Sequence, residues 1–373
     1  RPLAAAAAAG LGLDAAFLAG EPSALFAGRE LLAGIAEQGR MVRSAGSVPY
    51  TNQYVGTTKV LYDLGEIVLW GLGPALGLAA LLGCAARLRT FLKEREPREL
   101  LLWAWAVPFF AVTASFDVKF PRYLLPLYPL LLLGAAAMLA PREGEGSARR
   151  LARRGVLSLS AAYLLAFLAI YTRPHTIVAA SEWVHENVAP GATVLIQHWD
   201  EGFPFDLPDR PAERFRRIEL PFYEAEGPAK THLLAEQLAS GDVLALQTKR
   251  LYGAITRAKE RYPDTDRLFR LLFAGDLGYS LVRTFSSPPQ LFGLRLPSEL
   301  ADESFSVYDH PKAVVFRNAE RLSAAEIERR LREARPSKAL SRSEILRARP
   351  ADPDADSGER IGGTRVGRGA AVV

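Results

Sequence analysis

The sequence predicts a polytopic α-helical membrane domain with about four to five spans, followed by an extracytoplasmic α/β domain. Long apolar runs are concentrated in the first 171 of the 373 residues, although the mean hydropathy of the whole chain, +0.04, resembles that of a soluble protein. Beyond Tyr171, short β-type runs alternate with amphipathic segments. We therefore divide the chain into a membrane region (1–171), an α/β domain (172–325) and a final helix with a disordered arginine-rich tail (326–373).

Four apolar runs are long enough to cross a bilayer as helices, which takes roughly 17–25 residues. They are too long for barrel strands, and lipid offers no other way to satisfy the backbone. The alternative, buried core helices of a soluble protein, needs four such runs in a row without amphipathic faces. A fifth run, Leu3–Gly20, is weaker because Asp14 interrupts it. The four runs are Ile67–Ala86, Leu100–Phe116, Tyr123–Ala140 and Val156–Tyr171.

Basic residues in the short connections predict the orientation, because lysine and arginine near span ends are retained in the cytoplasm. The connections 87–98 and 142–154 are both arginine-rich, so we expect them inside. Residues 21–66, the loop Asp117–Arg122 and everything after Tyr171 are then expected on the outer face.

Lys119 and Arg122 stand on that outer face, where the topology rule does not require cations. They flank Pro121, at the start of an apolar helix, and a helix N-terminus with lysine and arginine beside it suits a phosphate or pyrophosphate. The alternative is that both side chains only contact lipid headgroups and anchor the helix. Residue types alone leave these two interpretations equal.

A cluster of neutral hydrogen-bonding and aromatic residues precedes the first strong span. Hydroxyl and amide groups beside aromatic faces suit a sugar, although an ordinary interfacial aromatic belt is the alternative. We take Gln53 and Tyr54 as candidate sugar- or acceptor-binding residues. The whole cluster comprises Tyr50, Asn52, Gln53, Tyr54, Thr57 and Thr58.

The region after Tyr171 reads as an α/β domain. Its first strand is followed by His198 and Asp200, at the carboxyl end where open α/β sheets present functional residues. These two could bind the acceptor or form an acid–base or metal pair, but a structural role, with Trp199 packing against the membrane part, is equally open. We expect helices at Ala180–Asn187, Leu251–Arg261 and Asp266–Phe273, strands at Thr193–Gln197, Asp242–Gln247 and Tyr279–Phe285, and a hairpin-like pair at Ser304–Asp309 and Ala313–Phe316.

No metal or other cofactor is expected. The 5 histidines are scattered, and the single cysteine, Cys84, lies in an apolar run, so neither a zinc signature nor a disulfide framework is present. The stretch Val307–Pro311 is expected to be structural rather than catalytic, because Pro311 fixes a turn at a strand end. The tail from about Pro336, rich in arginine, serine, aspartate and glycine, is expected to be disordered.

An ordered series of segments spans roughly residues 20–320: "PYTNQYVGTTKVLYDLGEIVLWGLGPALGL", "KFPRYLLPLYP", "HTIVAASEWVHENVAPGATVLIQHWDE", "LYGAITRAKERYP", "LFAGDLGY" and "ESFSVYDHPKAVVF". The series resembles the C-terminal half of GT-C type membrane glycosyltransferases, in the protein-mannosyltransferase-like superfamily. The resemblance implies an enzyme that transfers a hexosyl or pentosyl group from a polyprenyl-phosphate carrier to a glycan, lipid or protein acceptor on the outer face. Lys119 and Arg122 would then neutralise the phosphate leaving group.

The resemblance also implies a catalytic acidic residue in the first outer loop of the whole protein. Asp14, Asp63 and Glu66 do not match that position, so the catalytic residue is unassigned. The chain begins with Arg1 in an alanine-rich stretch rather than with methionine, and we expect it to be a piece of a longer protein.

The sequence leaves two other classes of function open. The main alternative is a non-catalytic, membrane-anchored subunit that binds a glycan or a partner protein. A transporter is weaker, because it would need ionisable residues within the spans, and the four apolar runs nearly lack them. Nothing in the sequence indicates a nucleic-acid partner.

Overall fold

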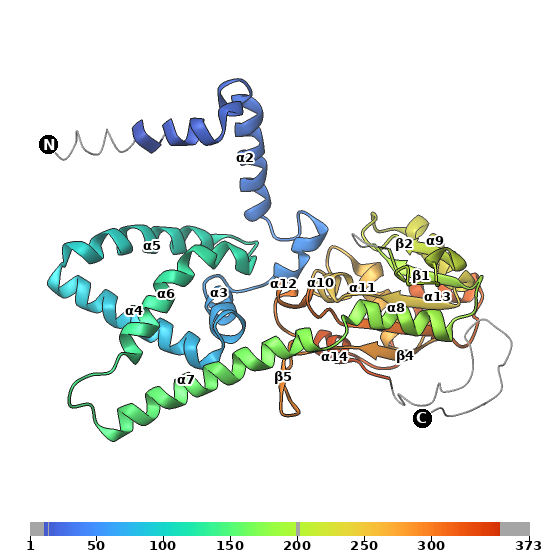
Figure 1. Ribbon diagram of the computed structural model, residues 1–373. Coiled ribbons are helices and arrows are strands. Elements are labelled where there is room, and N and C mark those ends of the chain that lie inside the picture. The colour runs from blue at the N-terminus through green and yellow to red at the C-terminus, as the bar shows by residue number, and fades with distance from the viewer. Residues whose placement is uncertain (1–10, 14, 199–201, 351–373) are drawn as a thin grey trace.

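The computed structural model describes residues 11–13, 15–198 and 202–350. Figure 1 shows a helical part and, beyond it, an α/β domain. The long helix α7 (Ser147–Leu168) leads from one to the other, and α8 (Thr176–Asn187) follows it and packs on the sheet. The described residues thus contain both kinds of region that the sequence predicts.

The helical part consists of α-helices joined by short 3-10 or π-helical turns. Its elements before α7 are η1 (Pro22–Leu25), α2 (Gly28–Val42), η2 (Pro49–Tyr54), α3 (Leu61–Glu66), η3 (Ile67–Gly71), α4 (Pro74–Glu94), α5 (Pro97–Ser115), η4 (Pro121–Leu127) and α6 (Tyr128–Leu139), and η5 (Ala169–Thr172) follows α7.

Three helical runs of the described chain are long and apolar enough to cross a membrane: Pro74–Glu94, Pro121–Leu139 and the apolar stretch within Ser147–Asn187. Helix α5 is also predicted as a span, but its apolar run, Glu99–Ser115, is shorter. The weak N-terminal run is described only in part, as a short apolar helix, and Asp14 lies outside the described residues. Length and composition thus support 3 of the predicted spans, and the orientation of the chain stays a prediction.

The predicted span Ile67–Ala86 is not one continuous helix. The chain makes the π-helical turn η3 and then reverses at Gly73, whose φ of +77° lies in the left-handed region, before Pro74 begins α4. A Cβ on Gly73 would lie 2.7 Å from the ring of Tyr163 on α7, so glycine permits both the turn and the close approach of α7. The predicted boundary was wrong because apolar composition alone does not reveal this break.

Helices α4 and α6 cross at two glycines. A Cβ on Gly83 would lie 1.9 Å from the carbonyl oxygen of Gly134, and one on Gly134 would lie 2.5 Å from Sγ of Cys84. Lipid tails are as apolar as leucine, so helices in a bilayer associate through such close contacts between small residues. The crossing therefore fixes two of the three apolar runs against each other.

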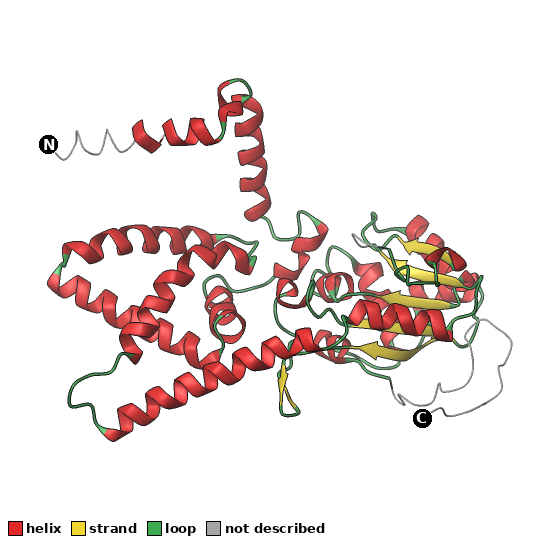
Figure 2. Cartoon of the chain, in the orientation of Figure 1, coloured by secondary structure: helices red, strands yellow, loops and turns green. Residues whose placement is uncertain are grey.

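The α/β domain is built on a mixed sheet, whose strands are yellow in Figure 2. The sheet has five strands in the order β2-β1-β3-β7-β4. Strands β1 and β2 and strands β1 and β3 are parallel, whereas β7 is antiparallel to both β3 and β4. A separate two-stranded hairpin, β5–β6, lies outside this sheet. The strands are β1 (Thr193–Gln197), β2 (Arg216–Leu220), β3 (Val243–Leu246), β4 (Tyr279–Phe285), β5 (Gln290–Leu291), β6 (Leu294–Arg295) and β7 (Ala313–Asn318).

Helices cover both faces of the sheet. On β1, Val194 and Ile196 pack with α8 on one face, and Leu195 packs on the other face in the main core, which several later helices of the domain complete. This alternation follows from the two-residue period of a strand. The remaining elements are η6 (Ala212–Arg214), α9 (Pro228–Ser240), α10 (Arg250–Ile255), α11 (Pro263–Ala274), α12 (Glu303–Ser306), α13 (Ala324–Glu333) and α14 (Arg342–Arg347).

Most of the predicted elements of this domain are present, although the predicted helix Leu251–Arg261 ends at Ile255, and two further predictions need correction. Residues 304–309 are not a strand: Asp302 accepts a hydrogen bond from the amide of Ser304 at 2.8 Å and caps the short helix α12. The partners of β7 are therefore β3 and β4 rather than a hairpin neighbour. The second correction concerns the tail, where residues 336–350 are described and include α14, whose Ile345 and Leu346 are buried in the main core. The predicted disorder is wrong for that segment.

We predict that Gly83→Leu prevents correct packing of α4 on α6, because the new side chain meets the backbone of Gly134 rather than a flexible neighbour. The yield of monodisperse protein in detergent, measured by fluorescence-detected size-exclusion chromatography, should fall strongly. Gly155→Leu on α7 is the matched control, since a Cβ there meets nothing within 4 Å. Equal yields for the two variants would show that the crossing is not required.

Candidate functional site

The loop that carries Lys119 packs against the polar segment that follows η2. Lys119 is buried, and its Nζ donates hydrogen bonds to Oγ1 of Thr57 at 3.1 Å and to the carbonyl oxygen of Asp117 at 3.0 Å. Burial lowers the pKa of Lys119, while the nearby carboxylate of Asp63 favours the charged form. The structure thus brings together two segments that the sequence analysis singled out independently.

Aromatic rings hold the same loop in place. The ring of Tyr54 meets those of Phe120 and Tyr62 edge to face, at centroid distances of 5.3 and 5.9 Å. The guanidinium of Arg122 lies over the Phe120 ring, 4.1 Å from its centroid. Lys119 is only 3% exposed, whereas Arg122 is exposed and has no ion-pair partner within the described part of the chain. Of the two predicted phosphate-binding cations, Arg122 is therefore the one that can meet a ligand directly.

Gln53 and Tyr62 connect this loop region to the α/β domain. The side-chain Oε1 atom of Gln53 accepts a hydrogen bond from the backbone amide of Glu303 at 3.0 Å. The backbone carbonyl oxygen of Gln53 accepts another from the Arg257 guanidinium at 3.1 Å. The hydroxyl of Tyr62 donates to Oδ2 of Asp302 at 2.7 Å. The side-chain oxygen of Gln53 is therefore used at the junction with the α/β domain, and of its side-chain atoms only the amide nitrogen Nε2 is left to bind a ligand.

Ionisable groups are concentrated at this junction, and we call Glu66, Lys249, Arg250, Asp302 and Glu303 the junction cluster. Burial and the neighbouring Asp302 carboxylate raise the pKa of Glu66 to about 8. Burial lowers the pKa of Lys249 to about 8. Burial also raises the pKa of Glu303, although Arg250 binds it at 2.6 Å and opposes the shift. Ionisable groups whose pKa values are shifted by burial and by neighbouring charges are a common property of functional sites.

Lys249 is held by the backbone as well as by charge. Its Nζ donates to the carbonyl oxygens of Ser298, Glu299 and Ala301, at 3.3, 3.0 and 2.7 Å. All three acceptors lie in the segment that leads into α12. Lys249 therefore fixes the position of Asp302 and Glu303 relative to the end of β3.

Several buried polar atoms near the junction have no hydrogen-bond partner among the described residues. They are Nδ2 and Oδ1 of Asn52, Nε2 of Gln53, Oδ2 of Asp63 and Oε2 of Glu66. Buried polar groups are normally hydrogen-bonded, so a cluster of unpaired ones indicates water or a ligand. The cavity beside Gln53, Lys249, Arg250, Glu303 and Arg342 measures only about 10 Å³, which is roughly the room of one water.

The junction cluster and Arg342 were missed by sequence reasoning. Glu66 directly precedes an apolar run, and an acidic residue at the edge of such a run could have been recognised from the sequence as a candidate functional residue. Asp302 and Glu303, in contrast, lie in an ordinary polar stretch, and only the fold brings them to Gln53. Arg342 belongs to the predicted disordered tail, yet its Nε donates to the carbonyl oxygen of Gly253 at 2.8 Å.

The remaining predicted site residues are not gathered here. His198 is exposed at the end of β1, and its Nδ1 lies 2.8 Å from Oε1 of Glu219 on β2. None of the contacts of the described residues joins it to Gln53 or Tyr54. Trp199, Asp200 and Glu201 lie outside the described residues, so their predicted roles stay predictions. Within the described ranges, no group of three or more histidine, cysteine, aspartate or glutamate residues could hold a metal ion.

The segment 307–311 contacts the chain where α7 passes into α8. Tyr171 donates to Oδ1 of Asp309 at 2.8 Å, and Thr176 donates to the carbonyl oxygen of Pro311 at 2.6 Å. His310 is buried, which lowers its pKa to about 4, and its ring meets that of Phe305 edge to face at 5.5 Å. These contacts suit the structural role that the sequence analysis predicts for this stretch.

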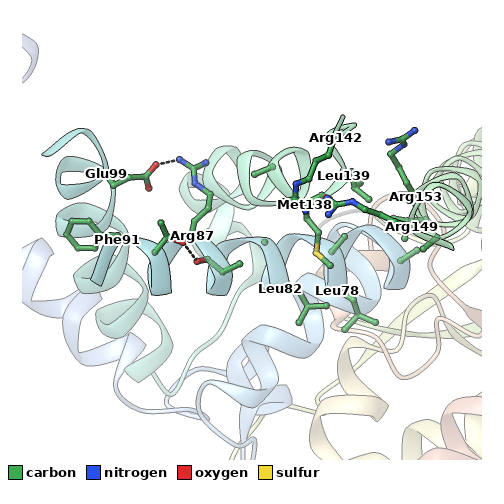
Figure 3. Close-up of a pocket in the computed structure, with 18 of the residues that line it drawn as sticks. Leu78, Leu82, Arg87, Phe91, Glu99, Met138, Leu139, Arg142, Arg149 and Arg153 are labelled. Atoms are coloured by element: carbon green, nitrogen blue, oxygen red, sulfur yellow. Dashed lines mark hydrogen bonds and ion pairs between the residues drawn. The ribbon is translucent and has the colours of Figure 1, made fainter. Parts of the chain in front are cut away.

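A much larger cavity, about 910 Å³, lies between α4, α6 and α7 (Figure 3). Leu78, Leu82 and Met138 line its apolar side, and Arg142 and Arg149 stand at one end. It borders the C-terminal end of the run Pro121–Leu139, whereas Lys119 precedes the N-terminal end of the same run. The cavity is therefore separate from the predicted phosphate site.

The comparisons with known proteins identify no relative: no family model matches the chain, and neither a curated protein nor a solved structure does. The interpretation of the junction thus rests on its own residues.

We predict that Glu66→Gln changes how stability depends on pH. The native state, with a Glu66 pKa of about 8, retains a proton that the unfolded chain releases near its ordinary pKa of 4.5, so this residue makes stability fall as pH rises between these values. Thermal unfolding in detergent should therefore show the parental protein losing stability relative to Glu66→Gln from about pH 5 to about pH 8. A difference between the two proteins that does not change with pH would contradict the raised pKa.

Replacing His310 by Gln should lower folded yield more than activity per folded molecule. The ring fills a buried site beside Phe305, and glutamine lacks the aromatic face. Yield after size exclusion and transfer rate per monodisperse molecule are measured together on the whole protein. A fully folded but inactive variant would contradict a structural role.

Proposed function

We propose that the chain belongs to a membrane glycosyltransferase that moves a sugar from a polyprenyl-phosphate carrier to an acceptor on the outer face of the membrane. The observation that carries this proposal is the hydrogen bond from Lys119 Nζ to Thr57 Oγ1. It joins the loop proposed for the donor phosphate to the segment proposed for the sugar. The segment proposed for the sugar is also hydrogen-bonded to the α/β domain, through Gln53 with Glu303 and Arg257.

Arg122 is the proposed contact to the donor phosphate. Its guanidinium is exposed, oriented by the Phe120 ring and without an ion-pair partner among the described residues. A guanidinium can bind two phosphate oxygens at once, which a lysine ammonium cannot do with the same geometry. Lys119 contributes through its charge, because it is buried and two of the three protons of its ammonium group are donated to Thr57 and Asp117.

Stabilisation of the leaving phosphate is the chemical step to which these cations contribute. As the glycosidic bond breaks, negative charge builds up on the phosphate, and fixed cations in a site shielded from water stabilise that charge most. The acidic residue that assists the acceptor is not assigned. Asp63 and Glu66 are buried, and neither lines the small cavity at the junction.

The second candidate function is a non-catalytic, membrane-anchored subunit that binds a glycan or a partner protein. Two observations favour it: the junction cavity is only about 10 Å³, and Lys119 is already hydrogen-bonded within the chain. Such a subunit would use the junction to hold the two parts of the chain together, and changing Arg122 would not affect sugar transfer.

We predict that Arg122→Ala, in the whole protein, lowers sugar transfer from polyprenyl-phosphate donors by roughly 10- to 100-fold. This is the loss expected when one charge-assisted contact of about 1.5–3 kcal/mol is removed. Arg122→Lys should restore only part of the rate, because the planar fork is lost. Transfer is measured in vitro with a panel of lipid-phosphate sugars.

Arg43→Ala is the matched control. Arg43 is another exposed arginine, directly after Val42, whose carbonyl oxygen accepts from the amides of Asp117 and Val118 at 2.8 and 3.1 Å. It tests whether any lost cation near this loop has the same effect. Normal folding together with parental transfer rates for both Arg122 variants would refute the phosphate site and favour the binding subunit.

A further inference from the structure

The hairpin β5–β6 projects from the body of the protein beside α7 (Figure 1). Its two short strands pair Gln290 with Arg295 and Leu291 with Leu294. The two-residue tip consists of Phe292 and Gly293, with φ of +49° and +81°. These angles fit a tight hairpin turn of the kind in which asparagine followed by glycine is favoured.

The tip of this hairpin is apolar and uncovered. Phe292 is 95% exposed and Leu294 is 78% exposed. A large aromatic residue at positive φ is strained, and asparagine would fit the turn better. The Phe292 ring makes almost no contact within the described structure and is therefore available to a partner outside it.

The base of the hairpin is fixed to the end of a membrane-length helix. Arg173 donates through Nη2 to the carbonyl oxygen of Pro288 at 2.8 Å, and through Nε to that of Ala169 in η5 at 3.1 Å. Strand β5 also contacts both α7 and η5. Tyr171, in the same turn, is 58% exposed, as is usual for tyrosine where a helix leaves the bilayer.

Positive charge accompanies these apolar residues. Arg295, in the second strand, is exposed and lies within electrostatic range of Arg173. Apolar side chains beside arginine, at the depth where a helix leaves the hydrocarbon, match the composition of the boundary between lipid headgroups and acyl chains.

We propose that the β5–β6 hairpin inserts its tip into the bilayer that surrounds α7, with Phe292 and Leu294 at the acyl boundary and Arg295 at the lipid phosphates. The partner is the lipid surface itself. The hairpin fixes the α/β domain at one height and rotation relative to the membrane, as a second attachment beside the α7–α8 connection. This inference depends on α7 crossing the membrane and not on the proposed enzyme activity.

The test is a site-specific labelling experiment, which is practical because the chain has a single native cysteine to replace. In a Cys84→Ala background, Phe292→Cys is labelled with an environment-sensitive fluorophore, and the full chain is reconstituted into vesicles with and without brominated phospholipid. Ser240→Cys, exposed at the end of α9 in the α/β domain, is the matched control. Size-exclusion profiles establish that the labelled variants are folded, and Leu294→Cys provides a second position on the hairpin.

The label at residue 292 should emit at shorter wavelength than the label at residue 240, lose at least half of its emission to brominated lipid and resist aqueous iodide. The label at residue 240 should show the opposite pattern. Iodide quenching at residue 292 equal to that at residue 240 would overturn the proposal. Protection at residue 292 from both quenchers would also overturn it, because a protein would then cover the tip.

Discussion

The joint between the helical part and the α/β domain depends on hydrogen bonds between buried groups. Gln53 accepts bonds from the amide of Glu303 and from Arg257, and Tyr62 donates to Asp302. A bond of this kind adds only about 1 kcal/mol, but removing one partner leaves a buried group unpaired at a cost of about 1–3 kcal/mol. The joint is therefore specific: a small rotation of one part against the other would leave several of these groups unpaired at once.

The segment that forms this joint also holds the loop around Lys119. The segment that supplies Gln53 continues to Thr57, which accepts a hydrogen bond from Lys119. Lys119 directly precedes Phe120, whose ring packs against Tyr54 and lies under the guanidinium of Arg122. A continuous series of contacts therefore runs from the α/β domain to the exposed cation. In the proposed enzyme, this arrangement would relate the position of the domain to the position of the donor phosphate.

The sequence predicted those features that depend on neighbouring residues. The apolar run at Thr193–Gln197 became β1, and the loop Asp117–Arg122 is an ordered connection at the start of an apolar run. Strand β2 was not predicted, because it lacks the apolar pattern of a core strand. It lies at the edge of the sheet, and its residues Arg216 and Arg217 are exposed. Helix α14 could have been found, because Ser341 and Glu344 form a capping box, which is visible in the sequence.

The junction cluster could not have been predicted in the same way. Gln53 and Glu303 are separated by 250 positions, and no local pattern marks Asp302 as the partner of Tyr62. The break at Gly73 was equally hidden, since it depends on the position of Tyr163 on another helix. Pairings of this kind are set by tertiary packing, and a single sequence carries no record of them.

The most direct test of the central claim, that the loops around Lys119 and Thr57 receive a polyprenyl phosphate, is to map where such a lipid binds. A polyprenyl phosphate with a photoreactive group next to the phosphate would be crosslinked to the full-length protein in a bilayer, and the modified peptides identified by mass spectrometry. The account predicts crosslinks within residues 49–58 and 117–123 that excess unlabelled polyprenyl phosphate abolishes. Crosslinks confined to the cavity beside Arg142 and Arg149, or to scattered lipid-facing positions that competitor does not affect, would contradict it.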